Sequence, residues 1–533
     1  MKKKKWERIW KLLFFVPGIV GLYGIINLNE GTFWDCIYKT AQLYVMEFSV
    51  ESEVLNPATE FARFMAPVAT AAAIAAALYS MVDYIRIWVK IRTNNVIAIH
   101  GDSANKDLVM ESLGNKAICS DKSIAFRAPR HILMFEDDFD MYHFMDEHGT
   151  KMFYGSEKEV FLCSEKILRG SYENRQLVVC NIAENCARDY WNKYPVTNKK
   201  EKILLLGFDN YGQRLLTQAI LKNVISTDSQ IEYHIAGDYH AYLSKHYHLN
   251  KTVYVKIINE KGEERDAKPY DSICDNHDTV YFYDMEWYEI LERNHFFDRV
   301  ILIEDMDAKN IELLNELKTY YADTACYMKF SDEKMLSALW NLEKENIVPF
   351  GVNKELYDPE TILKEKLFYH AKLIHSRYFA QYCCDGTVDG KPCQNKQNGN
   401  LCSLNQCVSC PNLLEDWSKL TTFLRYSNVA QADHIPEKIR LLLGADRRMD
   451  EPGIGDEAVK AYHQLNEEEK KKLWQIEHIR WNRYHFMNNW EYAPVRDKKK
   501  RKHPLLVPFD ELPLEEQKKD EDAYLALEEI LRG

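Results

Sequence analysis

The chain has no excess of positive charge. Its 69 Lys and Arg residues are outnumbered by 81 Asp and Glu residues, which gives a formal net charge of −12 at pH 7 over 533 residues. General nucleic-acid binders need surplus cations to displace the counterions of the phosphates, so we expect no nucleic-acid partner. The content of 46% hydrophobic and 28% charged residues is typical of globular proteins, and the length predicts three or four domains.

A recognisable set of catalytic residues is also missing. None of the clustered cysteines stands with a partnered base, and no acid–base group accompanies the glycine-containing turns described below. Nucleophilic or hydride-transfer chemistry would need such groups. We therefore predict that the protein is not an enzyme.

Two apolar stretches near the N-terminus are long enough to cross a bilayer as helices. The first runs from Leu12 to Leu28, and no small-residue cleavage site follows it, so we expect it to be retained rather than removed as a signal peptide. The second runs from Phe64 to about Trp88 and is rich in small residues that let membrane helices pack closely. Residues 1–92 are therefore predicted to form a two-span transmembrane region.

The charges around these spans predict their orientation. Cations precede the first span and follow the second, whereas the loop between them is mainly acidic; the cations are Lys2 to Lys5, Arg8, Lys11, Arg86, Lys90 and Arg92, and the acids include Glu30, Asp35, Glu47, Glu51, Glu53 and Glu60. Basic flanks stay on the cytoplasmic side of a membrane. We expect a multi-pass protein of the cell inner membrane with both termini in the cytoplasm.

The loop at 29–63 carries aromatic and aliphatic residues at roughly helical spacing. Two interpretations stay open: a re-entrant helix that lines a pore, as in the layout of two-span channels, or an amphipathic helix that only packs. The potassium-filter sequence TVGYG is absent, so no ion is specified. Two spans cannot enclose a pore alone, and a pore would therefore require a homo-oligomer.

Alternating strands and helices follow the membrane region. The run from Asn95 to Gly101 is a short apolar strand that leads into a helix, but Ser103 and Lys106 stand where a G-x-G-x-x-G turn has its second and third glycines. A cleaner unit begins at Lys202, where Gly207, Asp209 and Gly212 follow an apolar strand. We predict tandem α/β Rossmann-like domains at residues 93–198 and 199–335.

Residues 95–330 resemble two tandem copies of the TrkA-N, or regulator of potassium conductance, domain, with the first copy weakly matched. The resemblance is carried by ILLLGFDNYGQRLL and by Asp305 to Lys318, and it implies nucleotide or NAD binding by four residues: Gly207, Asp209, Gly212 and Asp238. Asp238 ends a strand where a ribose-binding carboxylate would sit. Asp209, however, would place a carboxylate near a pyrophosphate, so a purely structural role for this domain stays open.

Six of the thirteen cysteines lie in one short segment, CCDGTVDGKPCQNKQNGNLCSLNQCVSC. On the cytoplasmic side of a membrane, clustered thiolates favour a metal site over disulfides. We predict zinc at Cys393, Cys402, Cys407 and Cys410, with an iron–sulfur cluster or unligated thiols as the alternatives.

The stretch from Trp490 to Asp520 is a Pro-rich loop that follows a helix with Trp474, His478, Trp481 and His485 on one face. EHIRWNRY, WEYAPVRD and HPLLVPFDELP resemble the RyR domain, the repeat named after the ryanodine receptors. The resemblance implies a mainly helical module, which we place at residues 360–533, and a small, nucleotide-derived ligand. Ala493 departs from the family, which usually has Gly there.

Aromatic faces and cationic donors suit a phosphorylated aromatic ligand. The expected ligand-binding residues are Trp481, Trp490, Tyr492, Arg496, His503 and Asp510. The whole chain resembles membrane effectors of bacterial nucleotide-signalled antiviral systems, which implies a ligand-gated effector or an ion-channel-like protein. The alternative is a regulatory subunit of a cation (potassium) transport system, in which the spans are only an anchor.

Overall fold

The computed structural model divides the chain into two compact units, residues 1–97 with 120–128 and residues 98–119 with 129–533. Each unit is described by itself. The structure describes residues 14–28, 31–47, 55–93, 95–119, 123–153, 158–166, 177–267, 277–294, 296–320, 325–363, 366–380, 387–388, 391–392 and 411–532.

Among its described residues, the N-terminal unit contains the α-helices α2 (Val16–Ile26), α3 (Phe33–Tyr44) and α4 (Pro57–Thr93). They pack around a small core of Ile25, Cys36, Leu43, Ala62 and Ala66. Glycine permits the close approach, because a Cβ added to Gly21 would lie 2.7 Å from Leu43 Cδ1 and 2.9 Å from Ala62 Cβ. The Tyr44 hydroxyl donates to Phe14 O at 2.9 Å and so connects α3 to the start of α2.

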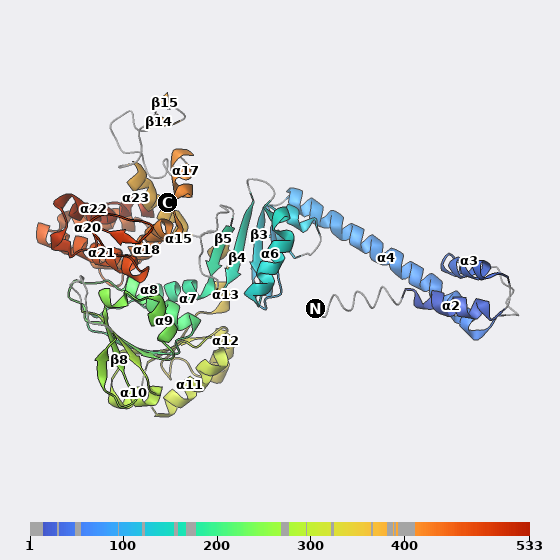
Figure 1. The fold of residues 1–533 in the computed structure, drawn as a ribbon, viewed down its shortest axis with the longest axis horizontal. Helices are drawn as coiled ribbons and strands as arrows, with labels where there is room; N and C mark the ends of the chain where they lie inside the picture. Colours follow the sequence, from blue (N-terminus) through green and yellow to red (C-terminus); the bar gives the residue numbers. More distant parts are fainter. Residues whose placement is uncertain are drawn as a thin grey trace. The chain divides into compact units, whose positions relative to one another are not determined.

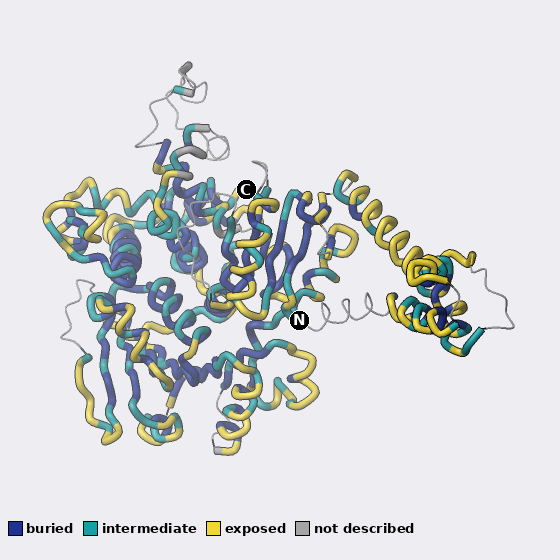
Figure 2. The backbone as a smooth tube through the Cα atoms, turned by 45° about the vertical axis from the view of Figure 1, so that its right-hand side comes forward, coloured by how far each residue is buried: buried dark blue, intermediate teal, exposed yellow. Residues whose placement is uncertain are grey.

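One described helix, α4, is long and apolar enough to cross a membrane. It contains the second predicted span, and its side chains are exposed along most of its length (Figure 2). The first predicted span lies partly outside the described residues. Its described helix α2 has 11 residues, about 16 Å at 1.5 Å per residue, which is short of a bilayer. The described residues thus support one spanning helix, and the expected pair stays a prediction.

The first α/β domain has a five-stranded sheet of order β2-β1-β3-β4-β5. Its strands are β1 (Ile97–His100), β2 (Ala117–Ile118), β3 (Arg130–Met134), β4 (Glu159–Ser164) and β5 (Leu177–Asn181), and its helices are α5 (Lys106–Leu113), α6 (Asp138–Met152) and α7 (Ile182–Lys193). Strands β3, β4 and β5 are parallel, as the strand–helix alternation predicts.

The second α/β domain has an eight-stranded sheet of order β13-β12-β11-β6-β7-β10-β8-β9. Its strands are β6 (Lys202–Leu206), β7 (Glu232–Ala236), β8 (Tyr254–Ile258), β9 (Glu264–Asp266), β10 (Thr279–Tyr283), β11 (Arg299–Leu302), β12 (Cys326–Lys329) and β13 (Ile347–Phe350). Neighbouring strands are parallel throughout this sheet except for β8 and β9, which are antiparallel. The sheet continues past residue 335, which is the predicted end of this domain.

Helices cover both faces of this sheet, which is why its central strands are continuous apolar runs (Figure 1). They include α8 (Asn210–Lys222), α9 (His240–Lys245), α10 (Trp287–Arg293), α11 (Asp307–Tyr320) and α12 (Glu333–Leu339). Of the two short helices that follow, α13 (Asn353–Leu356) contacts α7, and α14 (Pro359–Leu363) contacts α5 and β4 of the first domain. Strand β6 pairs with β7 on one side and with β11 on the other, so the strand order reverses between β6 and β11. In open parallel sheets, ligands bind at the carboxyl ends of strands beside such a switch point.

The C-terminal part is mainly helical, as predicted. Its helices are α15 (Lys366–Tyr378), α17 (Pro411–Lys419), α18 (Thr422–Asp433), α19 (Ile435–Leu443), α20 (Ile454–Gln464), α21 (Glu467–Met487), α22 (Leu514–Leu525) and α23 (Leu527–Leu531), with the short strands β14 (Thr387–Val388), β15 (Lys391–Pro392), β16 (Glu491–Tyr492) and β17 (Lys502–His503). A capping box of Asn466 and Glu469 starts α21, the longest helix of this part.

Helix α21 packs onto the second α/β domain through a buried ion pair. Arg483 Nη2 lies 2.7 Å from Asp278 Oδ2, and neither side chain is exposed. Arg483 Nη1 also donates to Ile220 O at 3.0 Å, at the end of α8. At the end of α21, His246 Nδ1 lies 2.9 Å from Met487 O, and Asn489 Nδ2 donates to Lys245 O at 2.8 Å. The C-terminal helices and the sheet are therefore joined by polar contacts, of which the pair of Arg483 and Asp278 is fully buried and is not screened by water.

Removing one partner of this pair should be costly. We expect Arg483→Met to lower the free energy of unfolding by about 3 to 5 kcal/mol, because Asp278 would remain buried without its cation. Denaturant unfolding of the full chain, followed by tryptophan fluorescence, measures the loss. Arg447→Met is the matched control, since its partner Glu457 is half-exposed, and a smaller loss is expected there. Equal losses in the two variants would contradict the role given to Arg483.

Candidate functional site

The Pro-rich loop after α21 is ordered by its own backbone. Asn489, with a φ of +60°, turns the chain out of the helix, a conformation that Asn tolerates. Strand β16 then pairs with β17, so that Tyr492 stands opposite His503. Between the strands, Asp497 Oδ1 accepts hydrogen bonds from Lys499 N and Lys500 N, each at 3.0 Å. The predicted ordered loop is thus confirmed.

An aromatic cluster lies where this loop meets α21. The ring centroids of Trp481 and His485 are 3.8 Å apart, and those of Trp481 and His503 are 5.0 Å apart. Trp490 is 5% exposed and stacks on Phe423 at 4.7 Å with an interplanar angle of 22°. One face of Trp490 is therefore already occupied inside the fold, whereas the half-buried Trp481 is the better placed of the two to meet a ligand.

His503 presents a neutral donor to this cluster. Its Nδ1 accepts a hydrogen bond from Leu505 N at 3.2 Å, so the ring proton is on Nε2. Burial, with a further contribution from Arg496, lowers the pKa of His503 to about 4. The imidazole is therefore uncharged near pH 7. The prediction that His503 is a cationic donor is wrong. Nε2 has no hydrogen-bond partner among the described residues.

Arg496 is the cation beside this donor. Its charge depresses the pKa of both His503 and His485, which places the guanidinium near the two rings. The side chain is exposed and forms no ion pair with any residue that the structure describes. Tyr492, in β16 just before this part of the loop, is 52% exposed. The structure thus brings together a free guanidinium, a neutral imidazole N–H and an indole.

Asp510 does not belong to this group. Its carboxylate binds Lys471 Nζ at 2.8 Å, near the start of α21. Lys471 precedes Trp481 by ten residues, about 15 Å along the helix. Phe423 also belongs to this cluster but is not predicted from the sequence, because no local sequence pattern connects a residue of α18 with the Pro-rich loop.

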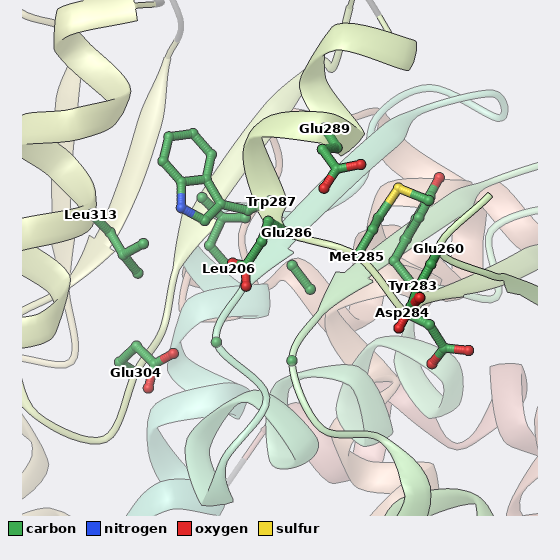
Figure 3. A pocket seen from close by; sticks show the side chains of 13 residues that line it. Leu206, Glu260, Tyr283, Asp284, Met285, Glu286, Trp287, Glu289, Glu304 and Leu313 are labelled. Atoms are coloured by element: carbon green, nitrogen blue, oxygen red, sulfur yellow. The ribbon is translucent and has the colours of Figure 1, made fainter. Parts of the chain in front are cut away.

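A second candidate site lies at the carboxyl edge of the eight-stranded sheet. A cavity of about 620 Å³ opens at the ends of β6, β7 and β10 (Figure 3). Gly207 has a φ of +102°, and a Cβ there would lie 2.8 Å from Glu304 N. A Cβ on Gly212 would collide with Gly207 O. Both glycines are therefore required by the turn itself, whether or not a nucleotide binds.

The acids predicted to hold a nucleotide do not line this cavity. Asp209 is exposed at the N-terminus of α8, where its side chain makes no capping hydrogen bond. Asp238 accepts from His240 N at 3.1 Å, and its side chain is 81% exposed. A pyrophosphate at the start of α8 would thus meet the carboxylate of Asp209, which opposes the attraction of the helix N-terminus.

The predicted zinc ligands Cys393, Cys402, Cys407 and Cys410 lie outside the described residues. Within the described part of the chain, no three His, Cys, Asp or Glu side chains are arranged to hold a metal ion. Zinc at the cysteine-rich segment therefore stays a prediction.

Comparison with known families identifies one part of the chain. The model of the RyR domain family matches residues 466–532, from the cap of α21 to the end of α23. These residues are a RyR domain. The match includes Trp481, Arg496 and His503, so the candidate site lies within the RyR domain. No curated protein and no solved structure matches the chain. The parallel sheets agree with Rossmann-like domains, and the TrkA-N resemblance stays a prediction.

The depressed pKa of His503 predicts acid sensitivity. An unfolded chain binds a proton at this residue below about pH 6.5, whereas the folded RyR domain does so only near pH 4. The contribution of His503 to stability is therefore present above pH 6.5 and is lost as the pH falls toward 4. We expect the melting temperature to fall over this window, and to fall less in His503→Gln, which cannot be protonated. Parallel pH profiles would contradict the burial of an uncharged His503.

Proposed function

We propose that this protein is a membrane-bound sensor whose RyR domain binds a small phosphorylated aromatic ligand in the cytoplasm. Ligand binding then acts on the N-terminal helices as in a ligand-gated effector or an ion-channel-like protein. The observation that carries the proposal is the unpaired guanidinium of Arg496 beside the unpartnered Nε2–H of His503 and the half-buried indole of Trp481.

These three groups are chemically complementary to a nucleotide-like molecule. A guanidinium forms paired, charge-assisted hydrogen bonds with phosphate oxygens. The neutral imidazole donates one further hydrogen bond without adding charge, and an indole stacks on an aromatic base. The exposed side chains of Lys498, Lys499 and Lys500 at the loop tip add positive potential around the same loop.

The contacts of α21 support transmission to the second α/β domain. The loop that carries Arg496 begins three residues after Met487, whose carbonyl oxygen lies 2.9 Å from His246 Nδ1. His246 directly follows α9, and Lys245 of α9 accepts from Asn489. A ligand that shifts the end of α21 would therefore act on α9 through two hydrogen bonds. The contact of His246 with Met487 is buried, whereas the hydrogen bond from Asn489 to Lys245 is exposed.

The membrane part of the proposal is supported by α4. This helix is long and apolar enough to span a bilayer, and only three residues separate its end at Thr93 from β1 at Ile97. Helix α3 buries Cys36 and Leu43 while Phe33, Trp34 and Tyr38 are exposed, as expected of a helix with one face in lipid or against another subunit. A pore would require several copies of the chain in one homo-oligomer.

A regulatory subunit of a cation transport system is the second candidate. It is favoured by the finding of one described helix that could span a membrane, because a single span suffices as an anchor. In that case ligand binding would occur at the same site, but the purified chain alone would pass no ions.

Arg496→Ala tests the ligand site. We expect this variant to lose about 1.5 to 3 kcal/mol of binding free energy for a phosphorylated aromatic probe, the range of a charge-assisted hydrogen bond. Calorimetry with ADP-ribose, ADP and a cyclic dinucleotide measures the loss, with adenosine as the uncharged counterpart. The fold should be unaffected because Arg496 is exposed and unpaired.

Lys518→Ala provides the matched control for this experiment. Lys518 is an exposed cation of α22 in the same RyR domain and has no ion pair among the described residues. Its removal should leave probe affinity unchanged. Equal losses in the two variants would indicate a general charge effect, and a probe bound equally well by wild type and Arg496→Ala would rule out the proposed site.

The orientation of the chain gives an independent test. Because cations flank the N-terminal region on one side, a reporter fused at Gly533 should be active only in the cytoplasm and one inserted next to Glu53 only outside it. The reverse pattern would place the RyR domain outside the cell and would remove cytoplasmic ligands from consideration.

A further inference from the structure

The cavity at the carboxyl edge of the second sheet has a charge opposite to that of the RyR site. Five acidic side chains line it, and its lining residues, all within the described chain, include no Lys, Arg or His. The acids come from separate elements: Glu260 follows β8, Asp284 follows β10, Glu286 and Glu289 belong to the start of α10, and Glu304 follows β11. A ligand in this cavity would therefore meet carboxylates on several sides.

Figure 3 shows how these groups surround the space. Glu304 is on one side together with Trp287, and Asp284 and Glu260 are on the other, with Glu286 between them. The indole of Trp287 stands beside Leu313 and forms an apolar wall. Indole is the strongest of the side-chain partners for an organic cation, because the negative face of the ring attracts positive charge.

The electrostatic environment of Glu304 also favours a cation in this cavity. Burial raises the pKa of this carboxyl group, and the like charges of Asp209 and Asp305 raise it further, although Lys309 at 3.5 Å acts against them. A bound cation would relieve this repulsion, whereas a phosphate would increase it.

Glu286 and Glu289 make no ion pair with any described residue. Their carboxylates are therefore available to a ligand, and neutralising them removes no contact from the fold. Both lie in or next to the first turn of α10, where the side chain of Glu286 makes no capping bond.

A dinucleotide, the group that the Rossmann-like fold implies, does not fit these residues. Its pyrophosphate would face the carboxylate of Glu304, and no Lys, Arg or His lines the cavity to compensate for that charge; Asp209, at the start of α8 and outside the cavity, adds a further negative charge on the approach. We infer that the cavity instead binds an organic cation with at least two separated amino groups, held between carboxylates on opposite walls and packed against Trp287. This inference is independent of the function proposed for the RyR domain.

Calorimetry on the full-length chain in detergent tests the inference with spermidine as the probe. The double variant Glu286→Gln, Glu289→Gln should lower spermidine affinity by ~10-fold or more, since each lost contact is charge-assisted. Trp287→Leu should also weaken binding, because it keeps an apolar wall but removes the aromatic face. Glu111→Gln, at an exposed acid of α5 with no partner among the described residues, is the charge-matched control and should bind as the wild type does.

Four results would overturn the inference. They are no spermidine binding by the wild type, equal affinity in the wild type and the double variant, displacement of spermidine by equimolar Mg²⁺ alone, and binding of NAD⁺ that is lost in Asp238→Ala. Melting temperatures of the double variant and the wild type should agree, which separates lost binding from lost structure. NAD⁺ should fail to compete with spermidine.

Discussion

The buried ion pair between Arg483 and Asp278 determines how the larger unit is held together. Two opposite charges with no solvent exposure are tolerated only if each finds its partner, so this contact fixes the position of α21 on the sheet. The RyR motif contains a second buried network, in which Arg480 Nη2 lies 2.7 Å and Lys438 Nζ 2.9 Å from Glu477. Burial alone would raise the pKa of Glu477, but these two cations lower it to about 2. The charged residues of EHIRWNRY thus serve the architecture, and the ligand chemistry is left to the loop that follows.

This division gives the molecule two sites of opposite character. The RyR loop presents Arg496 and neutral hydrogen-bond donors, which suit an anion with an aromatic part. The sheet edge presents carboxylates and Trp287, which suit a cation. Helix α9 follows β7 of the sheet edge, and Lys245 at its end and the adjoining His246 contact the end of α21. Ligands at the two sites would therefore act on one short helix. If one ligand changes the affinity of the protein for the second, the second must change the affinity for the first by the same factor.

Local sequence signals predicted much of this architecture. Strands such as β6 and β10 are apolar runs bounded by Gly or Asp, because both faces of a parallel sheet are buried. The Pro-rich RyR loop was predicted from its composition and motif. By contrast, the stack of Trp490 on Phe423 and the pair of Arg483 with Asp278 join residues far apart in the chain, 205 positions in the second case, and no local pattern encodes such contacts. The charge of His503 was mispredicted for a related reason, since its pKa depends on burial that only the folded structure reveals.

Hydrogen exchange of the full-length chain, with and without ADP-ribose, tests the central claim most directly. If the RyR domain is the sensor and its docking transmits binding, exchange should slow in residues 490–503 and also in α9 and the adjoining His246, with Arg496→Ala abolishing both effects. Such protection in two segments joined by hydrogen bonds is the expected sign of ligand coupling. Protection confined to residues 284–289 and 304–309, or none in 490–503, would show that the sensor is not the RyR loop.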